Sequence, residues 1–241
     1  MARPKRAECI NYLTIGGRKI MTYTTVTDGV DYPQATHINQ FATGLDNLET
    51  GWTTGVGTWT YASATSITIP SGGTSIYAVG DKIKLTQTTV KYFYVVGVAS
   101  TTLTITGGTD YTLTNAAITS PYYSHMGAPV GFPGYFNFTV TPTFTAGAAP
   151  TTEATSVCIF SIQGRMCTVS IYKSYTNAGT TVTLATMALP VAQVGAAHAA
   201  YGFLGVGATP SNIYADVQTT IRIAATSSSA NRLIAGATYP I

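Results

Sequence analysis

Short segments rich in β-branched and aromatic residues recur through most of this sequence, and glycine-containing turns separate many of them. Such segments alternate with a period of two residues, which is typical of strands with one buried face. The expected strands are 21–26, 58–61, 66–69, 81–87, 90–98, 101–106, 136–141, 156–162, 165–172, 180–185 and 213–225. Their number and short length predict an all-β fold class.

One segment, residues 35–49, has helical periodicity instead. Ile38, Phe41, Leu45 and Leu48 are spaced by three, four and three residues, which is the a/d seam of a coiled coil. An isolated helix of about fifteen residues is marginal in water. Two arrangements would stabilise it: the helix packs on a domain of its own chain, or three copies form a short bundle at the base of a trimer.

Turn-rich and proline-rich stretches divide the chain into segments. A Pro/Gly connector at residues 124–134 separates two expected β domains, as part of a stretch with three prolines and three glycines. The predicted organisation is a basic N-terminal tail (1–20), a strand plus short helix for attachment or trimerisation (21–50), a small β-barrel-like domain (51–123), the connector (124–134), and a C-terminal β-sandwich that is jelly-roll-like (135–241).

Charge is scarce: 9% of the residues are charged, against about 25% in an average domain. Five of the twelve basic residues lie near the start: Arg3, Lys5, Arg6, Arg18 and Lys19. After residue 20 the chain has seven basic and eight acidic side chains, so no specific nucleic-acid binding is expected. Low charge is typical of a chain that sits in an assembly, and a secreted β domain with a threonine-rich surface is the alternative. The uncharged run 187–210 is broken by proline, glutamine, histidine and four glycines, so no membrane insertion is expected.

Residues 158–167 are expected to form a hairpin that turns at Gln163 and Gly164. A two-residue turn there pairs Phe160 with Cys167 and places Cys158 on the same face. The three cysteines have no metal-ligand spacing, and Cys158 and Cys167 are interpreted as small buried hydrophobic residues, not a disulfide.

Residues for catalysis, metal binding or cofactor binding are not evident, so no catalytic residue, metal or cofactor is predicted. His37, His125 and His198 lie in three separate segments, none with a second ligand at suitable spacing. A glycosidase needs two carboxyl groups about 5 to 9 Å apart. Asp46 and Glu49 lie three residues apart on the helix, where solvation of its outer face is the favoured role.

Aromatic residues gather near the connector: Tyr122, Tyr123, Phe132, Tyr135 and Phe136. Exposed rings of this kind stack on sugar faces, and buried rings fill a junction between domains. The prolines and glycines around them favour a packed junction, with ligand binding as the alternative.

Several runs of this sequence resemble a β module that recurs in bacteriophage virion proteins. The similarity covers about residues 51–134, through the runs 59–63 (WTYAS), 77–87 (YAVGDKIKLTQ), 89–93 (TVKYF), 107–113 (GGTDYTL), 118–124 (ITSPYYS) and 128–133 (APVGFP). Residues 35–48 are similar to the short helical segments that precede fibre domains, and the C-terminal part resembles virion β-sandwiches in general.

This resemblance implies a structural protein of the phage particle and no enzyme. The leading expectation is a homotrimeric tail fibre or spike that contributes to host-surface attachment. A decoration protein of the capsid or tail is the first alternative, and a glycan-degrading tail enzyme is the second. The expected partners are further copies of the chain, other virion proteins, and a host-surface glycan or protein.

Overall fold

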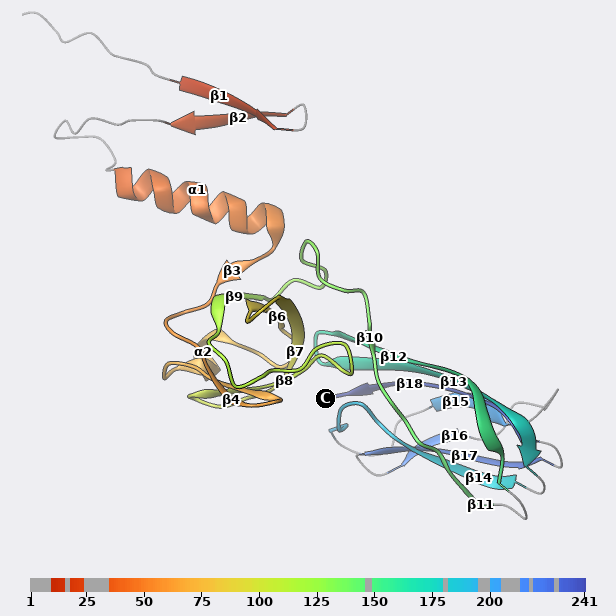
Figure 1. The fold of residues 1–241 in the computed structure, drawn as a ribbon. Coiled ribbons are helices and arrows are strands. Elements are labelled where there is room, and N and C mark those ends of the chain that lie inside the picture. Colours follow the sequence, from red (N-terminus) through yellow and green to blue (C-terminus); the bar gives the residue numbers. More distant parts are fainter. Residues whose placement is uncertain are drawn as a thin grey trace, which may run out of the picture. The chain divides into compact units, whose positions relative to one another are not determined.

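The computed structural model describes residues 10–15, 18–23, 35–145, 149–179, 182–194, 200–204, 213–216, 219–227 and 230–241. The chain divides into two compact units, Met1–Gly51 and Trp52–Ile241. Strands in antiparallel sheets make up most of the described chain (Figure 1). The predicted all-β fold class is therefore confirmed.

The first unit holds a two-stranded hairpin and a helix. β1 (Ile10–Ile15) pairs antiparallel with β2 (Arg18–Tyr23), with Ile15 opposite Arg18. The predicted boundary at residue 20 between a basic tail and a strand at 21–26 is wrong, because β2 begins at Arg18 and ends at Tyr23. Gly16 and Gly17, a pair that two-residue hairpin loops favour, separate the two strands in the sequence.

The predicted helix is confirmed as α1 (Ala35–Thr50). It ends where the Gly51 N–H donates to the Asn47 carbonyl oxygen at 2.7 Å, and the Thr50 hydroxyl donates to the Asp46 carbonyl oxygen. These bonds satisfy carbonyl groups that the end of a helix otherwise leaves free.

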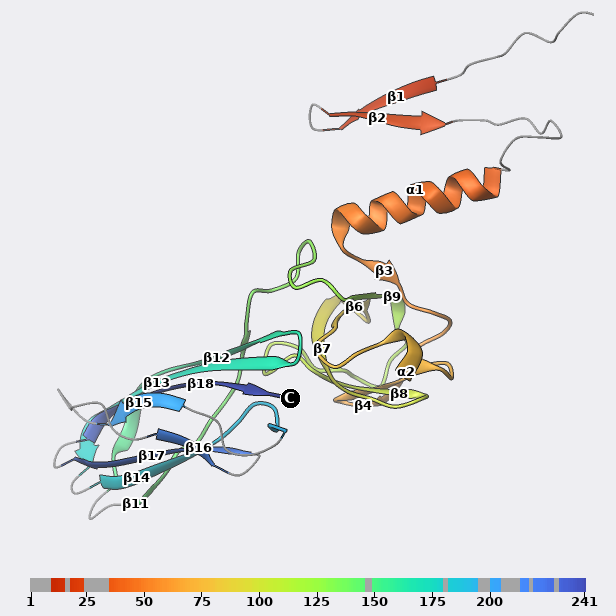
Figure 2. The ribbon, with the colours of Figure 1, turned by 180° about the vertical axis from the view of Figure 1, so that it is seen from behind.

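The second unit begins with a seven-stranded sheet. Its strand order is β3-β9-β6-β7-β8-β5-β4, and the views from the front and from behind both show that it curls (Figures 1 and 2). No ladder joins its edge strands β3 and β4 in the described residues, so closure into the predicted barrel is not confirmed. The elements are β3 (Thr53–Thr54), β4 (Thr60–Ser63), β5 (Ser66–Thr68), α2 (Gly73–Ile76), β6 (Lys82–Thr86), β7 (Val90–Val98), β8 (Thr102–Thr106) and β9 (Thr119–Ser124).

A compact core fills the concave side of this sheet. Trp59, Ile67, Ile83, Phe93 and Leu103 are among its buried members. These residues alternate with exposed or half-buried neighbours along β5 and β8, as the period-two pattern predicted.

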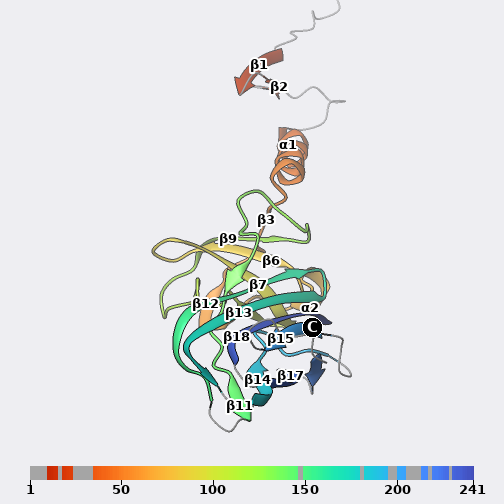
Figure 3. The same cartoon turned by 90° about the vertical axis from the view of Figure 1, so that its right-hand side faces the viewer.

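The rest of the second unit is a two-layer sandwich (Figure 3). One sheet has the order β10-β12-β13-β18-β15 and the other β11-β14-β17-β16. The strands are β10 (Phe136–Asn137), β11 (Thr143–Thr145), β12 (Thr151–Gln163), β13 (Met166–Gly179), β14 (Val182–Ala188), β15 (Ala200–Leu204), β16 (Ile213–Asp216), β17 (Thr220–Ser227) and β18 (Ala230–Pro240).

One strand of the sandwich differs from expectation. The single strand predicted at 213–225 is the hairpin of β16 and β17, in which Asp216 pairs with Thr220. The jelly-roll connectivity stays a prediction.

The β12–β13 hairpin turns one residue later than predicted. Gln163 pairs with Met166, so Gly164 and Arg165 form the loop, and Phe160 pairs with Val169 instead of Cys167. Gly164 has φ 54°, which a glycine adopts without strain at the first central position of a hairpin loop. The partner register therefore shifts by two residues, which leaves every side chain on its predicted face.

Both cysteines of this hairpin are free and buried, as predicted. Burial raises the pKa of the Cys167 thiol to about 11, so the neutral thiol is the form that packs in the core. Cys9 lies outside the described residues.

The connector predicted at 124–134 does not separate two independent β domains, because 52–241 forms one unit. Tyr94 of β7 belongs to the hydrophobic cluster of the sandwich, and Tyr92 and Tyr111 pack against that cluster. A Cβ atom on Gly80 would collide with the Gly164 carbonyl group, so the β12–β13 loop lies directly against the turn before β6. Aromatic rings and close backbone contact thus join the sheet to the sandwich.

Candidate functional site

Helix α1 carries the seam that the sequence predicted as an oligomer interface. Leu45 is 52% exposed and Leu48 is 74% exposed. Every described side chain of α1 is exposed except that of Asn47, which is half-buried. The side chains of Ile38 and Phe41 lie outside the described ones. Within the first unit, the described part of α1 therefore has almost no packing.

Two of the five predicted aromatic residues lie at the junction of the sheet and the sandwich. Phe136 is fully buried, and its ring centroid lies 5.2 Å from Tyr94 and 6.0 Å from Phe160. Phe132 lies 5.0 Å from Tyr94. These two rings have the packing role that the sequence analysis favoured.

The three tyrosines of that set make no direct ring contact with Phe132 or Phe136 in the described part of the chain. Tyr135 is 55% exposed. On β9, Tyr123 makes edge contacts with Tyr77 at 5.0 Å and with the His125 ring at 5.3 Å. The structure does not bring the five residues together into one ligand site.

Tyr122 takes part in a lysine–aromatic cluster at β9. The Lys84 ammonium group lies 4.5 Å from the Tyr122 ring centroid and 4.6 Å from that of Trp52. The Trp52 indole N–H donates to the Val130 carbonyl oxygen at 2.8 Å, which ties the connector to the sheet. Burial lowers the pKa of Lys84, and the two ring faces stabilise its charge.

His125 pairs with a buried carboxylate that the sequence analysis did not assign. Its Nδ1 lies 2.8 Å from Asp81 Oδ1, and Asp81 Oδ2 accepts the Ala78 N–H at 2.8 Å. The His125 side chain is 58% exposed. The side chains of His37 and His198 lie outside the described ones.

The other described carboxylates of the second unit also have partners. Asp110 accepts the backbone N–H of Asn137 at 2.8 Å and its side-chain N–H at 2.9 Å. Glu153 accepts from the ammonium group of Lys173, which is almost fully buried. These contacts fasten neighbouring segments to one another.

In the part of the chain that the structure describes, no group of three or more histidine, cysteine, aspartate or glutamate residues could hold a metal ion. No described helix is long and apolar enough to cross a membrane.

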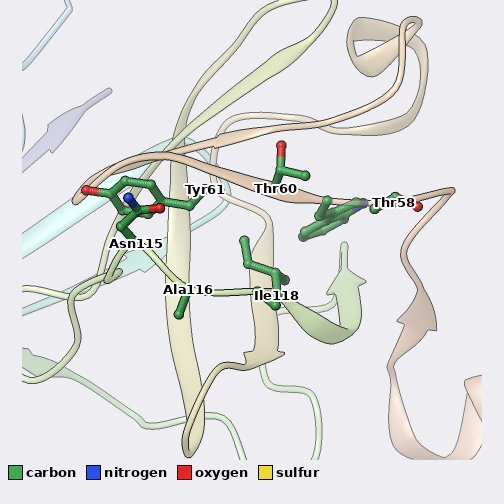
Figure 4. Close-up of a pocket in the computed structure, with 8 residues that line it drawn as sticks. Thr58, Thr60, Tyr61, Asn115, Ala116 and Ile118 are labelled. Atoms are coloured by element: carbon green, nitrogen blue, oxygen red, sulfur yellow. The ribbon is translucent and has the colours of Figure 1, made fainter.

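A groove lies between residues 58–61, which include the start of β4, and residues 115–118, which lead into β9 (Figure 4). We call it the β4 groove. Its volume is about 330 Å³, and its lining contains no charged residue. Sequence reasoning missed it because its two walls are more than fifty residues apart in the chain. The one available signal was the aromatic pair Trp59 and Tyr61 two positions apart, which the strand pattern places on one face.

Comparisons of the chain with protein-family models, with curated proteins and with solved structures found no match.

Proposed function

We propose that this chain is a structural protein of a bacteriophage particle, a homotrimeric fibre or spike that contributes to attachment to the host surface. The observation that carries the proposal is the exposure of α1. Leu45 and Leu48, two of the four seam residues, are not covered by other parts of the first unit. A short helix with so little packing needs partners to be stable, and an a/d seam is a surface that copies of the same helix can bury.

Charge beside the seam is low. Around the seam of α1, the described charged side chains are Asp46 and Glu49 alone. Both are exposed, so their repulsion between copies of the helix is screened by solvent and costs little.

The β body supports a structural role. Its sheet and its sandwich share a buried aromatic cluster, and its described carboxylates bond to nearby backbone and side-chain groups. The resemblance of residues 51–134 to a recurrent virion module agrees with this role.

Light scattering coupled to size exclusion tests the oligomeric state of the full chain. The expected mass at micromolar concentration is three times the 25.2 kDa of one chain. Leu45→Asp is expected to lower the trimer content, because it places a carboxylate in the seam. Thr43→Asp is the matched control, since Thr43 is exposed and lies outside the a/d positions. A monomeric parent, or an equal response of the two variants, would contradict the proposal.

Antibody labelling of purified particles from the source phage tests the location. Label at the tail or at projecting fibres is the expected result. Label spread evenly over the capsid would support a decoration protein instead. Release of reducing ends from host polysaccharide by the purified chain would indicate a glycan-degrading enzyme.

A further inference from the structure

The β4 groove lies at an open edge of the seven-stranded sheet. β4 is the last strand in the sheet order and has a ladder partner, β5, on one side only. Across the groove, residues 115–118 run into β9, which belongs to the opposite end of the same sheet. The groove therefore marks the gap that the curled sheet leaves between β4 and the segment before β9.

The lining combines apolar surface with free polar groups. Ile118 and Tyr61 are half-buried and present part of their apolar surface to the groove, and the buried Trp59 lies beneath them in the lining. In Figure 4, Tyr61 and Asn115 lie toward one end of the groove and Thr58 toward the other. Neither the Tyr61 hydroxyl nor the Asn115 carboxamide has a hydrogen-bond partner among the described residues. Asn115 alone can donate two hydrogen bonds and accept two.

The loop that carries Asn115 is held in place from behind. Gln87 donates through Nε2 to the carbonyl oxygens of Thr114 at 2.8 Å and Ala116 at 3.2 Å. Its Oε1 accepts the Thr114 N–H at 3.1 Å, and Lys91 donates to the Thr112 carbonyl oxygen at 2.6 Å. Because these bonds already fix the loop, little loop entropy is lost when a ligand binds.

We propose that the β4 groove binds a neutral saccharide unit, an inference that rests on the proposed attachment function and names its ligand class. A pyranose ring has apolar C–H faces and a rim of hydroxyl groups, which match an aromatic ring beside a free carboxamide. A lining without charge fits a neutral sugar and gives no favourable ion pair to an acidic one. A volume of about 330 Å³ is enough for one or two sugar rings.

An added peptide strand is the competing occupant of an open sheet edge, and β4 is a poor template for it. β4 is four residues long, and the register of its pairing with β5 shifts between Tyr61 and Ser63. Short edge strands and bulges are features that prevent the pairing of further strands.

Saturation-transfer NMR on the full chain tests the inference, with lactose, maltose and N,N′-diacetylchitobiose at millimolar concentration as the probes. Transfer to at least one of them is expected. Asn115→Ala and Tyr61→Leu are expected to weaken that binding about tenfold or more, because each removes one recognition element. Tyr135→Ala is the matched control, since Tyr135 is an exposed tyrosine outside the groove.

Asn115 is exposed, so Asn115→Ala keeps the fold, and Tyr61→Leu keeps apolar packing at the edge of the core. The absence of transfer to all three sugars would overturn the inference. Transfer of undiminished strength in both Asn115→Ala and Tyr61→Leu would also overturn it. Transfer to the neutral peptide acetyl-Thr-Val-Thr-Val-amide but to none of the sugars would overturn it in favour of strand addition. Light scattering on the same samples keeps the two proposals apart, because a trimer without sugar binding refutes this inference alone.

Discussion

Replacement of Phe136 by alanine should strongly destabilise the second unit, because this ring lies where the sheet and the sandwich meet. Phe136 is fully buried, and its ring contacts Tyr94 and Tyr111 of the sheet region and Phe160 of β12. A buried Phe→Ala substitution costs about 3 to 5 kcal/mol through lost transfer energy and the cavity that remains. Each aromatic pair adds about 0.5 to 1.5 kcal/mol, so we expect a loss near the top of that range, about 4 to 5 kcal/mol.

Urea denaturation measures this loss and also tests whether the sheet and the sandwich unfold together. Both tryptophans of the chain, Trp52 and Trp59, lie in the seven-stranded sheet region, so their fluorescence reports on it. Far-UV circular dichroism reports on all strands. With an m-value of about 3 kcal/mol/M, the midpoint of Phe136→Ala should fall by about 1.5 M.

The two signals of the parent protein should change at the same urea concentration, because the rings couple the two parts. Tyr135→Ala, one residue away and exposed, should change the stability by less than about 0.5 kcal/mol. The packing argument would be refuted by a loss below about 1 kcal/mol for Phe136→Ala. Separate transitions of the parent by the two probes would refute the coupling.

Two further predictions concern buried lysines. Burial lowers the pKa of Lys82, and the nearby charge of Asp81 partly opposes this shift. The unfolded chain therefore binds the ammonium proton of Lys82 more tightly than the folded chain does. The free energy of unfolding of the parent should therefore rise relative to that of Lys82→Met as the pH increases from the lowered pKa toward 10.5. Chemical denaturation of both proteins at several pH values measures this difference. Parallel plots of unfolding free energy against pH would contradict the prediction. Glu153→Ala should cost about 2 kcal/mol, less than a fully buried pair because Glu153 is 41% exposed, and adding Lys173→Met should restore most of the loss in thermal unfolding.

Local sequence patterns predicted the elements that are formed by contacts between residues close together in the sequence. The a/d spacing of Leu45 and Leu48 marked α1 to within one residue of its end, because helical periodicity is set by residues three and four apart. The faces of the β12–β13 hairpin were right although its register was wrong, since a shift of two residues leaves the alternation unchanged.

Features that depend on distant segments were outside the reach of these patterns. The pairing of β18 with β13 and the buried Asp81–His125 contact join segments more than forty residues apart. β1 and the first half of β2 were missed because the five basic side chains of residues 1–20 suggested a solvated tail, whereas strand pairing is compatible with charge on an exposed face. The β4 groove exists only because the sheet curls, which no strand by itself specifies.

The size of the α1 seam implies that a trimer also needs contacts from outside α1. Full burial of a leucine side chain contributes about 1.5 to 3 kcal/mol, and Leu45 and Leu48 already have part of that burial in the single chain. Six such leucines in a trimer contribute about 9 kcal/mol. Each of the two association steps costs about 4 to 15 kcal/mol in lost freedom.

Burial of Ile38 and Phe41 would reduce the gap between the free energy gained by burying the seam and the cost of association. A seam of two heptads would still give only a weak trimer. Contacts elsewhere in the chain would then have to supply the remaining free energy, and its composition suits them. A surface of threonine, serine and asparagine is desolvated at lower cost than one of lysine and glutamate, because no full charge leaves water. Scarce charge and the helical seam of α1 would therefore both favour the proposed assembly.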